Sequence, residues 1–336
     1  MSNIAFVGEA WGEVEAFERK PFVGPTGYAF TKMLEEVGIQ RNACFLTNVF
    51  NLKPPANDMK YLCGPKNDAI VGYPALIKAG YVSQKYKREL DRLRDELEKV
   101  NPNVVVALGN VATWALLGKT GITKLRGVTQ LSTHTIAGFK VYPAFHPAYV
   151  MRDYYNRPTF IADLRRIKKQ SRFPEVIRPS RRIWINPTLE DIVEFDIRYI
   201  KPAERLAVDI ETFDRWITCI GIAPSAEVSI VIPIFIPGRA PRAYWQDHAT
   251  SIKVKRIIRG ILGRPIPKTF QNGLYDIAFL WRAERIKVVN AEEDTMLLHH
   301  ALYPEAQKSL GYMGSLYTDE GSWKQMRVKT TIKRED

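Results

Sequence analysis

The chain has 336 residues, of which 46% are hydrophobic and 25% charged, a composition typical of globular proteins and not of disordered or low-complexity chains. Its 49 basic residues outnumber the 36 acidic ones, giving a formal net charge of +13, and residues 1–172 alone hold 25 basic against 15 acidic side chains. This excess favours a polyanionic partner, most simply a nucleic acid. No apolar run reaches the roughly 18 residues of a membrane-spanning helix, so we expect no membrane partner.

In the front half, short apolar runs alternate with segments of helical periodicity. We expect strands at 4–7, 44–49, 103–109 and 139–145 and helices at 27–37, 86–100 and 111–117. This alternation predicts an α/β domain over residues 1–172 with a mainly parallel sheet. Within 86–100, the leucines share one helical face, and we interpret the charged remainder as a solvated face.

Residues 173–182 contain two prolines and three arginines without periodicity, which is typical of a linker. Behind it the order changes, and we expect strands at 183–185, 205–210, 217–223 and 228–236 and helices at 188–200, 250–262, 274–285 and 292–302. Thr188 is a candidate N-cap, with Asp191 three residues later. Strands in succession followed by helices predict a mixed sheet with flanking helices over residues 183–336.

Polar side chains follow three of the front-half strands. Glu9 comes after the first strand, Asn48 lies at the end of the second, and His146 follows the last. Because the carboxyl ends of parallel strands meet at one edge of a sheet, these residues are expected to converge. With Phe22, they could hold a flipped base: an aromatic ring for stacking, an amide for the base edge, a carboxylate to position water and an imidazole to stabilise an anion. Each residue also has a structural alternative, as a helix-entry acid, a core ring, a turn cap or a loop histidine.

Six segments in order resemble the uracil-DNA glycosylase superfamily, most closely the thermophile-type family 4 enzymes: FVGEAWGEVE, PFVGPTG, TNVFNLKPP, VVVALGNVA, GITKLRG and VYPAFHPAYVMR. The resemblance covers residues 4–169 and implies a four-stranded parallel sheet between helices. It implies that Phe22, Asn48 and Ala10 bind uracil. It also implies that Glu9, assisted by Glu15, orients the attacking water and that His146 stabilises the charge on uracil O2.

The same resemblance implies a surface that contacts DNA. Its members are a wedge at Tyr149 and Met151 and the basic side chains Arg152, Arg165, Arg166 and Lys168. Trp11, at which this chain departs from the family, is a further candidate as a platform for DNA bases to stack on. Trp11 replaces the proline of the family's GEAPG-like turn. The family also holds an iron–sulfur cluster with four cysteines, whereas this chain has only Cys44, Cys63 and Cys219. We therefore expect no cluster and no cofactor for the glycosylase.

A second set of carboxylates lies in the back half. Asp209 and Glu211 are two residues apart on a strand-like run and so share one face, and Asp276 begins an apolar helix. The segments VDIET, NGLYD, EDTMLLHHALYPE and KSLGYMGSLYTD resemble the proofreading 3′–5′ exonuclease domain of phage family A DNA polymerases. The resemblance implies an RNase H-like fold and implies that Asp209, Glu211 and Asp276 bind Mg²⁺ or Mn²⁺.

One aspartate of that family pattern is missing. None of the tyrosines or histidines between 299 and 317 is followed by an aspartate at the family spacing. We therefore expect the domain over 183–336 to be incomplete at its C-terminus. The sequence does not decide whether this domain has exonuclease activity.

Two functions are compatible with these sequence features. The first is a phage-type enzyme that excises uracil from single- or double-stranded DNA, joined to an exonuclease-like domain. The alternative is a non-catalytic module that binds uracil or single-stranded DNA and docks as the N-terminal part of a replicative DNA polymerase. The lack of a disulfide framework favours a cytoplasmic location, and a DNA partner favours association with the host nucleoid.

Overall fold

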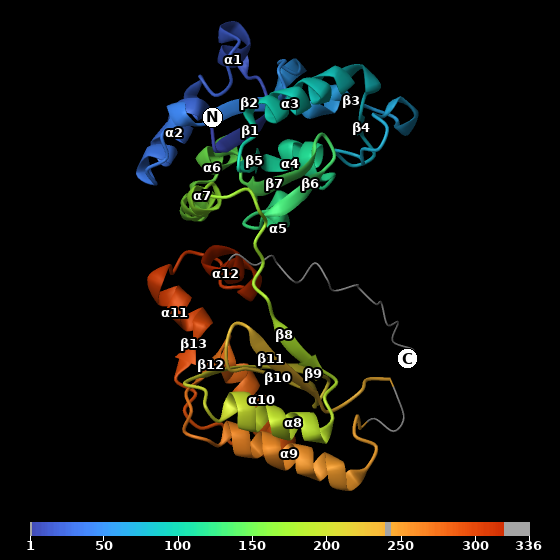
Figure 1. Ribbon diagram of the computed structural model, residues 1–336, viewed down its shortest axis with the longest axis vertical. Coiled ribbons are helices and arrows are strands. Elements are labelled where there is room, and N and C mark those ends of the chain that lie inside the picture. The colour runs from blue at the N-terminus through green and yellow to red at the C-terminus, as the bar shows by residue number, and fades with distance from the viewer. Residues whose placement is uncertain (1, 239–242, 319–336) are drawn as a thin grey trace. The chain divides into compact units, whose positions relative to one another are not determined.

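The computed structural model describes residues 2–238 and 243–318. Within these residues the chain forms two compact units, one of residues 2–177 and 311–318 and one of residues 178–238 and 243–310 (Figure 1). The first unit contains β1 (Ile4–Ala10), α1 (Glu13–Glu18), α2 (Pro25–Glu36), β2 (Phe45–Phe50), β3 (Cys63–Gly64), β4 (Tyr81–Val82), α3 (Lys87–Val100), β5 (Val104–Leu108), α4 (Gly109–Leu117), α5 (Ile122–Leu125), β6 (Gln130–Thr133), β7 (Ala137–Ala144), α6 (Pro147–Arg152) and α7 (Arg157–Gln170).

The first unit is built on a five-stranded sheet in the order β2-β1-β5-β7-β6. The first four strands are parallel and β6 is antiparallel to β7. The four parallel strands are those implied by the resemblance, and the antiparallel edge strand β6 was not expected. Because β1, β2 and β7 run in the same direction, their carboxyl ends reach the same edge of the sheet.

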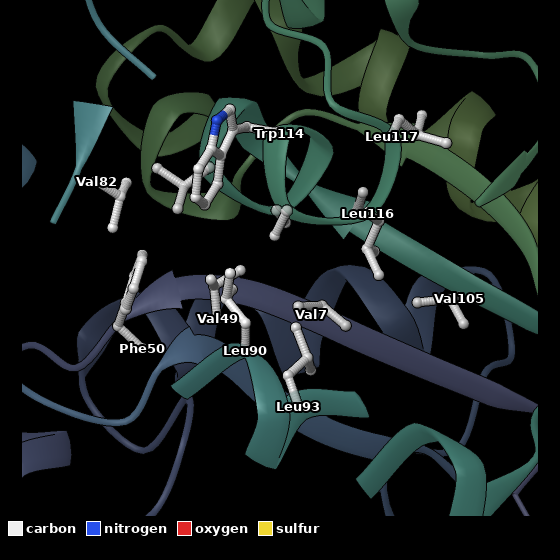
Figure 2. Close-up of a cluster of buried hydrophobic side chains, with 14 of the residues drawn as sticks. Val7, Val49, Phe50, Val82, Leu90, Leu93, Val105, Trp114, Leu116 and Leu117 are labelled. Atoms are coloured by element: carbon white, nitrogen blue, oxygen red, sulfur yellow. The ribbon is translucent and has the colours of Figure 1, made fainter. Parts of the chain in front are cut away.

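Both faces of this sheet are buried, which explains why its strands are continuous apolar runs. Along β1, Ala5 and Val7 pack into one core cluster, whereas Ile4 and Phe6 pack into another. The first cluster contains Leu90 and Leu93 of α3 and Trp114 of α4 (Figure 2). The second is covered by α2, α6 and α7. Helices therefore cover both faces of the sheet.

A buried ion pair joins α7 to Arg126, the residue that follows α5 in sequence. Arg126 donates from Nε and Nη2 to the carboxylate of Asp163 at 2.9 and 2.7 Å, and the Tyr142 hydroxyl donates to the same carboxylate at 3.0 Å. Asp163 is fully buried. Arg126 Nη1 also donates at 2.7 Å to the hydroxyl of Ser315.

Ser315 belongs to α12 (Leu310–Tyr317), and residues 311–318 lie on the first unit. The Tyr312 hydroxyl hydrogen-bonds that of Thr159 at 2.8 Å, and Arg166 Nη1 donates to the Ser315 carbonyl at 2.5 Å. The predicted division places a linker at 173–182 between domains over 1–172 and 183–336. The observed arrangement differs, because polar side chains of α7 bind a segment that follows the second unit in sequence. The end of the predicted domain, 319–336, lies outside the described residues.

The second unit contains β8 (Arg182–Ile185), α8 (Leu189–Phe195), β9 (Leu206–Phe213), β10 (Trp216–Ala223), β11 (Val228–Pro233), α9 (His248–Leu262), β12 (Lys268–Phe270), α10 (Gly273–Glu284), β13 (Glu293–Asp294) and α11 (Thr295–Leu302). Its sheet has the order β13-β12-β9-β10-β11-β8. Strands β9, β10 and β11 are antiparallel neighbours, and β12 and β13 continue the sheet parallel to β9. The five strands from β9 to β13 have the order of an RNase H-like sheet.

Local sequence signals explain the start of α8. The Thr188 side chain accepts the Asp191 backbone N–H at 3.1 Å and the Asp191 carboxylate accepts the Thr188 N–H at 2.8 Å, a reciprocal capping box. The predicted helix 188–200 is divided, because a π-helical turn over Asp196–Ile200 follows α8. The α/β class predicted for both parts of the chain is confirmed. Among the described residues no helix is long and apolar enough to cross a membrane.

The buried ion pair gives a stability prediction. We expect Asp163→Ala to lower the free energy of unfolding of the first unit by about 3–5 kcal/mol, because it leaves the Arg126 guanidinium buried without its carboxylate. The matched control is Asp91→Ala, which removes a partly exposed pair with Lys87 and should cost at most about 1 kcal/mol. Urea denaturation of the full chain measures both variants, and equal losses would contradict this assignment.

Candidate functional site

A cavity of about 300 Å³ opens where β1, β2 and β7 end, at the lower end of the range of about 300–1,000 Å³ common for small-molecule sites. Its wall contains predicted residues from all three segments: Glu9, Ala10, Trp11, Glu15, Phe22, Asn48, His146 and Arg152. The parallel sheet thus brings together residues that are up to 143 positions apart in sequence.

Phe22 reaches this wall through an unusual backbone conformation. Its φ of 56° lies in the left-handed region, which is rare for a bulky residue. Its carbonyl accepts Arg41 Nη2 at 2.7 Å and lies so close to Gly27 that a Cβ there would be 1.8 Å away. The PFVGPTG segment therefore combines a strained aromatic residue with a glycine that makes room for it. The Phe22 ring lies 6.1 Å from the His146 ring at an interplanar angle of 27°.

The side chain of Asn48 is buried at the end of β2, where Asn48 pairs with Gly8 of β1. A Cβ at position 8 would lie 2.2 Å from Asn48 Oδ1 and 2.6 Å from Cζ of Phe22. Only glycine leaves space for both side chains at this point. Gly8 is therefore the position at which β1 admits the amide and the aromatic ring to the cavity.

His146 is held in one orientation by the start of α6. It is the N-cap residue, and its Nδ1 accepts the backbone N–H of Ala148 at 3.2 Å. Burial lowers the pKa of His146 to about 4, and the positive charge of Arg152 lowers it further, against an opposing effect of Glu15. The imidazole is therefore neutral at pH 7, and because Nδ1 is the acceptor, the proton lies on Nε2. This makes Nε2 a hydrogen-bond donor.

The two acids of the cavity have different surroundings. Burial raises the pKa of the Glu9 carboxyl above its ordinary value. The positive charge of Arg152 partly offsets this effect, and the negative charge of Asp58 adds to it. Glu15 instead contributes to the local fold, since its Oε1 accepts the backbone N–H of Gly24, the N-cap of α2, at 2.9 Å. Glu9 is thus the acid whose proton affinity is tuned by the cavity, while Glu15 ties the loop that carries Phe22 to α1.

Trp11 lines the cavity without closing it. Its backbone N–H donates to the Leu52 carbonyl at 3.1 Å, which holds the turn after β1 against the segment after β2. Its indole nitrogen is buried and has no hydrogen-bond partner in the part of the chain that the structure describes. Sequence reasoning did not identify Thr26, Pro54, Asn57 and Ala148, which complete the wall. Two of them could have been found from the sequence: Pro54 belongs to the Pro-Pro pair after the second strand, and Ala148 lies two positions after His146.

The predicted DNA-contacting residues fall into two groups. Tyr149 and Met151 of α6 are 36% and 45% exposed, and Arg152, Arg165 and Lys168 are also exposed. Arg166 is buried and donates to the Ser315 carbonyl. The prediction of Arg166 as a phosphate contact is therefore wrong, because its guanidinium is committed to the interior.

The carboxylates of the second unit lie near one another without forming a cluster. Asp209 and Glu211 are both exposed on β9, as the two-residue period predicts. Asp276 is buried on α10, and its carboxylate accepts the Ile210 N–H at 3.1 Å. Burial raises the pKa of Asp276 to about 6, and the negative charge of Asp209 raises it as well. Within residues 2–238 and 243–318, no group of three or more Asp, Glu, His or Cys side chains could hold a metal ion.

Asp294, a conceivable substitute ligand, has a structural task. Its carboxylate accepts the backbone N–H groups of Asn272 and Gly273 at 3.1 and 2.7 Å and of Met296 at 2.8 Å, so it caps both α10 and α11. Asp319 and Asp336, which follow Asp294 in the sequence, lie outside the described residues. The arrangement of the described carboxylates therefore does not fit a two-metal centre.

The cysteines do not fit an iron–sulfur cluster. The first unit contains Cys44 and Cys63, half the number of thiolates that such a cluster needs. Burial raises the pKa of Cys44 to about 11 and also raises that of Cys63. Both sulfurs lie near backbone carbonyls, those of Gln40 and Met59.

Several solved structures match part of the chain. The catalytic core of RRP6 from Trypanosoma brucei matches with a TM-score of 0.31 and 15% identity, over 46% of this chain and 38% of that one. The EXD2 exonuclease domain soaked in Mg matches with a TM-score of 0.26 and 11% identity, over 36% of this chain and 58% of that one. These scores are too low to assign a fold or a function to any part of the chain.

Sequence comparison gives a clearer result for the first unit. The model of the uracil DNA glycosylase superfamily matches residues 1–167. The type-4 uracil-DNA glycosylase of Thermotoga maritima is 34% identical over 168 residues, covering 49% of this chain and 72% of that protein. That of Sulfurisphaera tokodaii is 30% identical over 180 residues, covering 52% and 72%. A DNA polymerase of Bacillus phage SP01 is 26% identical over 216 residues, covering 63% of this chain and 21% of the polymerase. On these matches, the chain belongs to the uracil-DNA glycosylase superfamily.

Proposed function

We propose that the first unit excises uracil from DNA by hydrolysing the bond between the base and the sugar C1′. The observation that carries the proposal is the cavity lined by Glu9, Phe22, Asn48 and His146. A base must leave the stack to enter such a cavity, and unpaired or mismatched bases leave it at the lowest cost.

Each side chain has a chemical task in this reaction. Phe22 stacks on the base and the Asn48 amide hydrogen-bonds its edge. As the glycosidic bond breaks, negative charge grows on the base, and the Nε2–H of neutral His146 donates to the oxygen that carries it. The Glu9 carboxylate accepts a proton from the water that attacks C1′. Water oxygen is transferred to C1′, and the departing base takes up a proton.

Exposed residues of α6 and α7 are the proposed contacts with DNA. Tyr149 and Met151 on α6 would press into the space that the base leaves, and Arg152, Arg165 and Lys168 would contact phosphates. Trp11 would stack on a neighbouring base. Residues 1–172 are the proposed glycosylase domain, and the basic surplus of this segment favours a DNA partner.

A second candidate is a binding module within a replicative DNA polymerase. It is favoured by the match to the phage SP01 polymerase, which covers a larger share of this chain than the glycosylase matches do. In that case the cavity would grip uracil or single-stranded DNA without cleaving it. Measurement of excision together with binding separates the two candidates.

The proposed activity predicts that the full chain, without added metal, forms alkali-labile sites in an oligonucleotide that contains one uracil.

Asn48→Asp should retain folding and relax discrimination against cytosine, because the carboxylate no longer offers the amide N–H₂ to the base edge. Excision from matched uracil and cytosine oligonucleotides measures the ratio. Binding without excision at enzyme excess would instead support the binding module, and unchanged selectivity would remove Asn48 from base recognition.

The pKa shifts of Glu9 and His146 predict the pH profile. Because the pKa of Glu9 is raised, the single-turnover rate should rise with pH as Glu9 loses its proton, above the range of an ordinary glutamate. His146, with a pKa of about 4, should contribute no step near pH 6.5.

Glu9→Gln should lower the rate by about 10²–10⁴-fold and remove the acid limb of the pH profile. Arg152→Ala should move that limb to higher pH, since a positive charge near Glu9 is lost; an acid limb that survives in Glu9→Gln would contradict the assignment.

For the second unit, we expect no shortening of a 3′-labelled oligonucleotide by this chain with Mg²⁺ or Mn²⁺. The reason is that Asp209, Glu211 and Asp276 are not gathered into one site in the described part of the chain, and hydrolysis of this kind needs a clamp of carboxylates around its metals. Degradation that is lost in Asp209→Ala would contradict this expectation and show that the carboxylates assemble when metal and DNA bind.

A further inference from the structure

The charged side of α3 faces the strand that carries Asn48. Glu89, Arg92 and Glu96 form a stripe beside the apolar face of the helix, and all three are largely shielded from solvent, with side chains 13%, 25% and 28% exposed. The interpretation of the charged remainder of this helix as a solvated face is therefore wrong for these residues. Their partners are backbone and side-chain groups of residues 47–51.

Arg92 uses every nitrogen of its guanidinium. Its Nη2 donates to the backbone carbonyls of Asn48 at 2.8 Å and Val49 at 3.0 Å. Its Nε lies 3.2 Å from the Glu89 carboxylate and its Nη1 2.7 Å from that of Glu96. The fork is thus fixed by two acids on one side and directed at two carbonyls on the other.

The two acids also bind the strand themselves. Glu96 accepts the Thr47 hydroxyl at 2.7 Å, and Glu89 accepts the Asn51 backbone N–H at 3.1 Å. Since β2 is an edge strand of the sheet, β1 is its one strand neighbour within the described part of the chain. Backbone groups at the end of an edge strand need other partners, and α3 supplies them from residue 47 to residue 51.

This network holds the backbone of Asn48 in place. The Asn48 side chain lies against Gly8, and the carbonyl of the same residue is held by Arg92. A backbone rotation that turned the amide out of the cavity would have to break the bond to Arg92. The direction of the amide is therefore set by a side chain that is not among those lining the cavity.

We propose that Arg92, preorganised by Glu89 and Glu96, is a positioning residue that fixes Asn48 for base recognition. The inference rests on the proposed uracil excision and deepens it. A lysine could not take this place, because a single ammonium lacks the planar fork that spans two carbonyls and two carboxylates. Arg92 is also unavailable to DNA phosphates, since its charge is neutralised by two carboxylates.

A double-mutant cycle tests the proposal in the full chain. Arg92→Ala should lower kcat/KM for uracil by about 10–100-fold, the loss expected when a recognition group is misplaced by about 1 Å. In an Asn48→Ala background the same change should cost less than about threefold, because Arg92 acts through the amide. Arg94→Ala is the matched control, since Arg94 lies on the same helix, is 42% exposed and pairs with Asp91 and Asp95; it should leave the rate unchanged. Additive effects of Arg92→Ala and Asn48→Ala would overturn the proposal.

Two further measurements cover the other outcomes. Hydrogen exchange of the amides at 48–51 should be at least about tenfold faster in Arg92→Ala than in Arg94→Ala, whether or not DNA is cleaved. Unchanged exchange there would overturn the positioning role, whereas absence of excision by the unaltered chain would overturn the proposed function alone. If Arg92→Ala does not fold, Glu96→Gln retains the guanidinium while removing one charged anchor. It should shift exchange and kcat/KM in the same direction by a smaller factor, and a rate and exchange equal to those of the unaltered chain would count against the network.

Discussion

The parallel pairing of β1 with β2 and β5, and of β5 with β7, is the constraint on which the site depends. In a parallel sheet every strand ends at the same edge, so the segments after β1, β2 and β7 meet without any sequence proximity. The register pairs Gly8 with Asn48, and the missing side chain at Gly8 is what admits the amide and the Phe22 ring. A shift of one residue would place a side chain in that space and turn Asn48 to the other face of the sheet.

The same cavity changes the proton affinity of Glu9 and His146 in opposite directions. Burial disfavours charge, so it raises the pKa of Glu9 and lowers that of His146. The neutral histidine becomes a donor with a defined tautomer, and the acid gains basicity when ionised. A pair tuned in this way suits a reaction in which water is activated on one side and negative charge develops on the other.

Much of this could be predicted from the sequence because it follows from periodicity and strand order. The α/β class and most elements depend on patterns within a few residues, and the convergence of Glu9, Asn48 and His146 follows from their places at the ends of parallel strands. The burial of Arg166 and the stripe on α3 could not be predicted in this way, because a charged residue looks the same in sequence whether it faces water or a strand edge. The return of residues 311–318 to the first unit depends on contacts with α7 and Arg126, more than 140 residues earlier.

The most direct test of the central claim is a crystal structure of the Glu9→Gln chain with a uracil-containing oligonucleotide. We predict that uracil is turned out of the strand into the cavity, with its ring on Phe22, its edge on the Asn48 amide and an oxygen within hydrogen-bond distance of His146 Nε2. A base that remains stacked in the DNA, or one that occupies a different surface while the cavity stays empty, would contradict this claim.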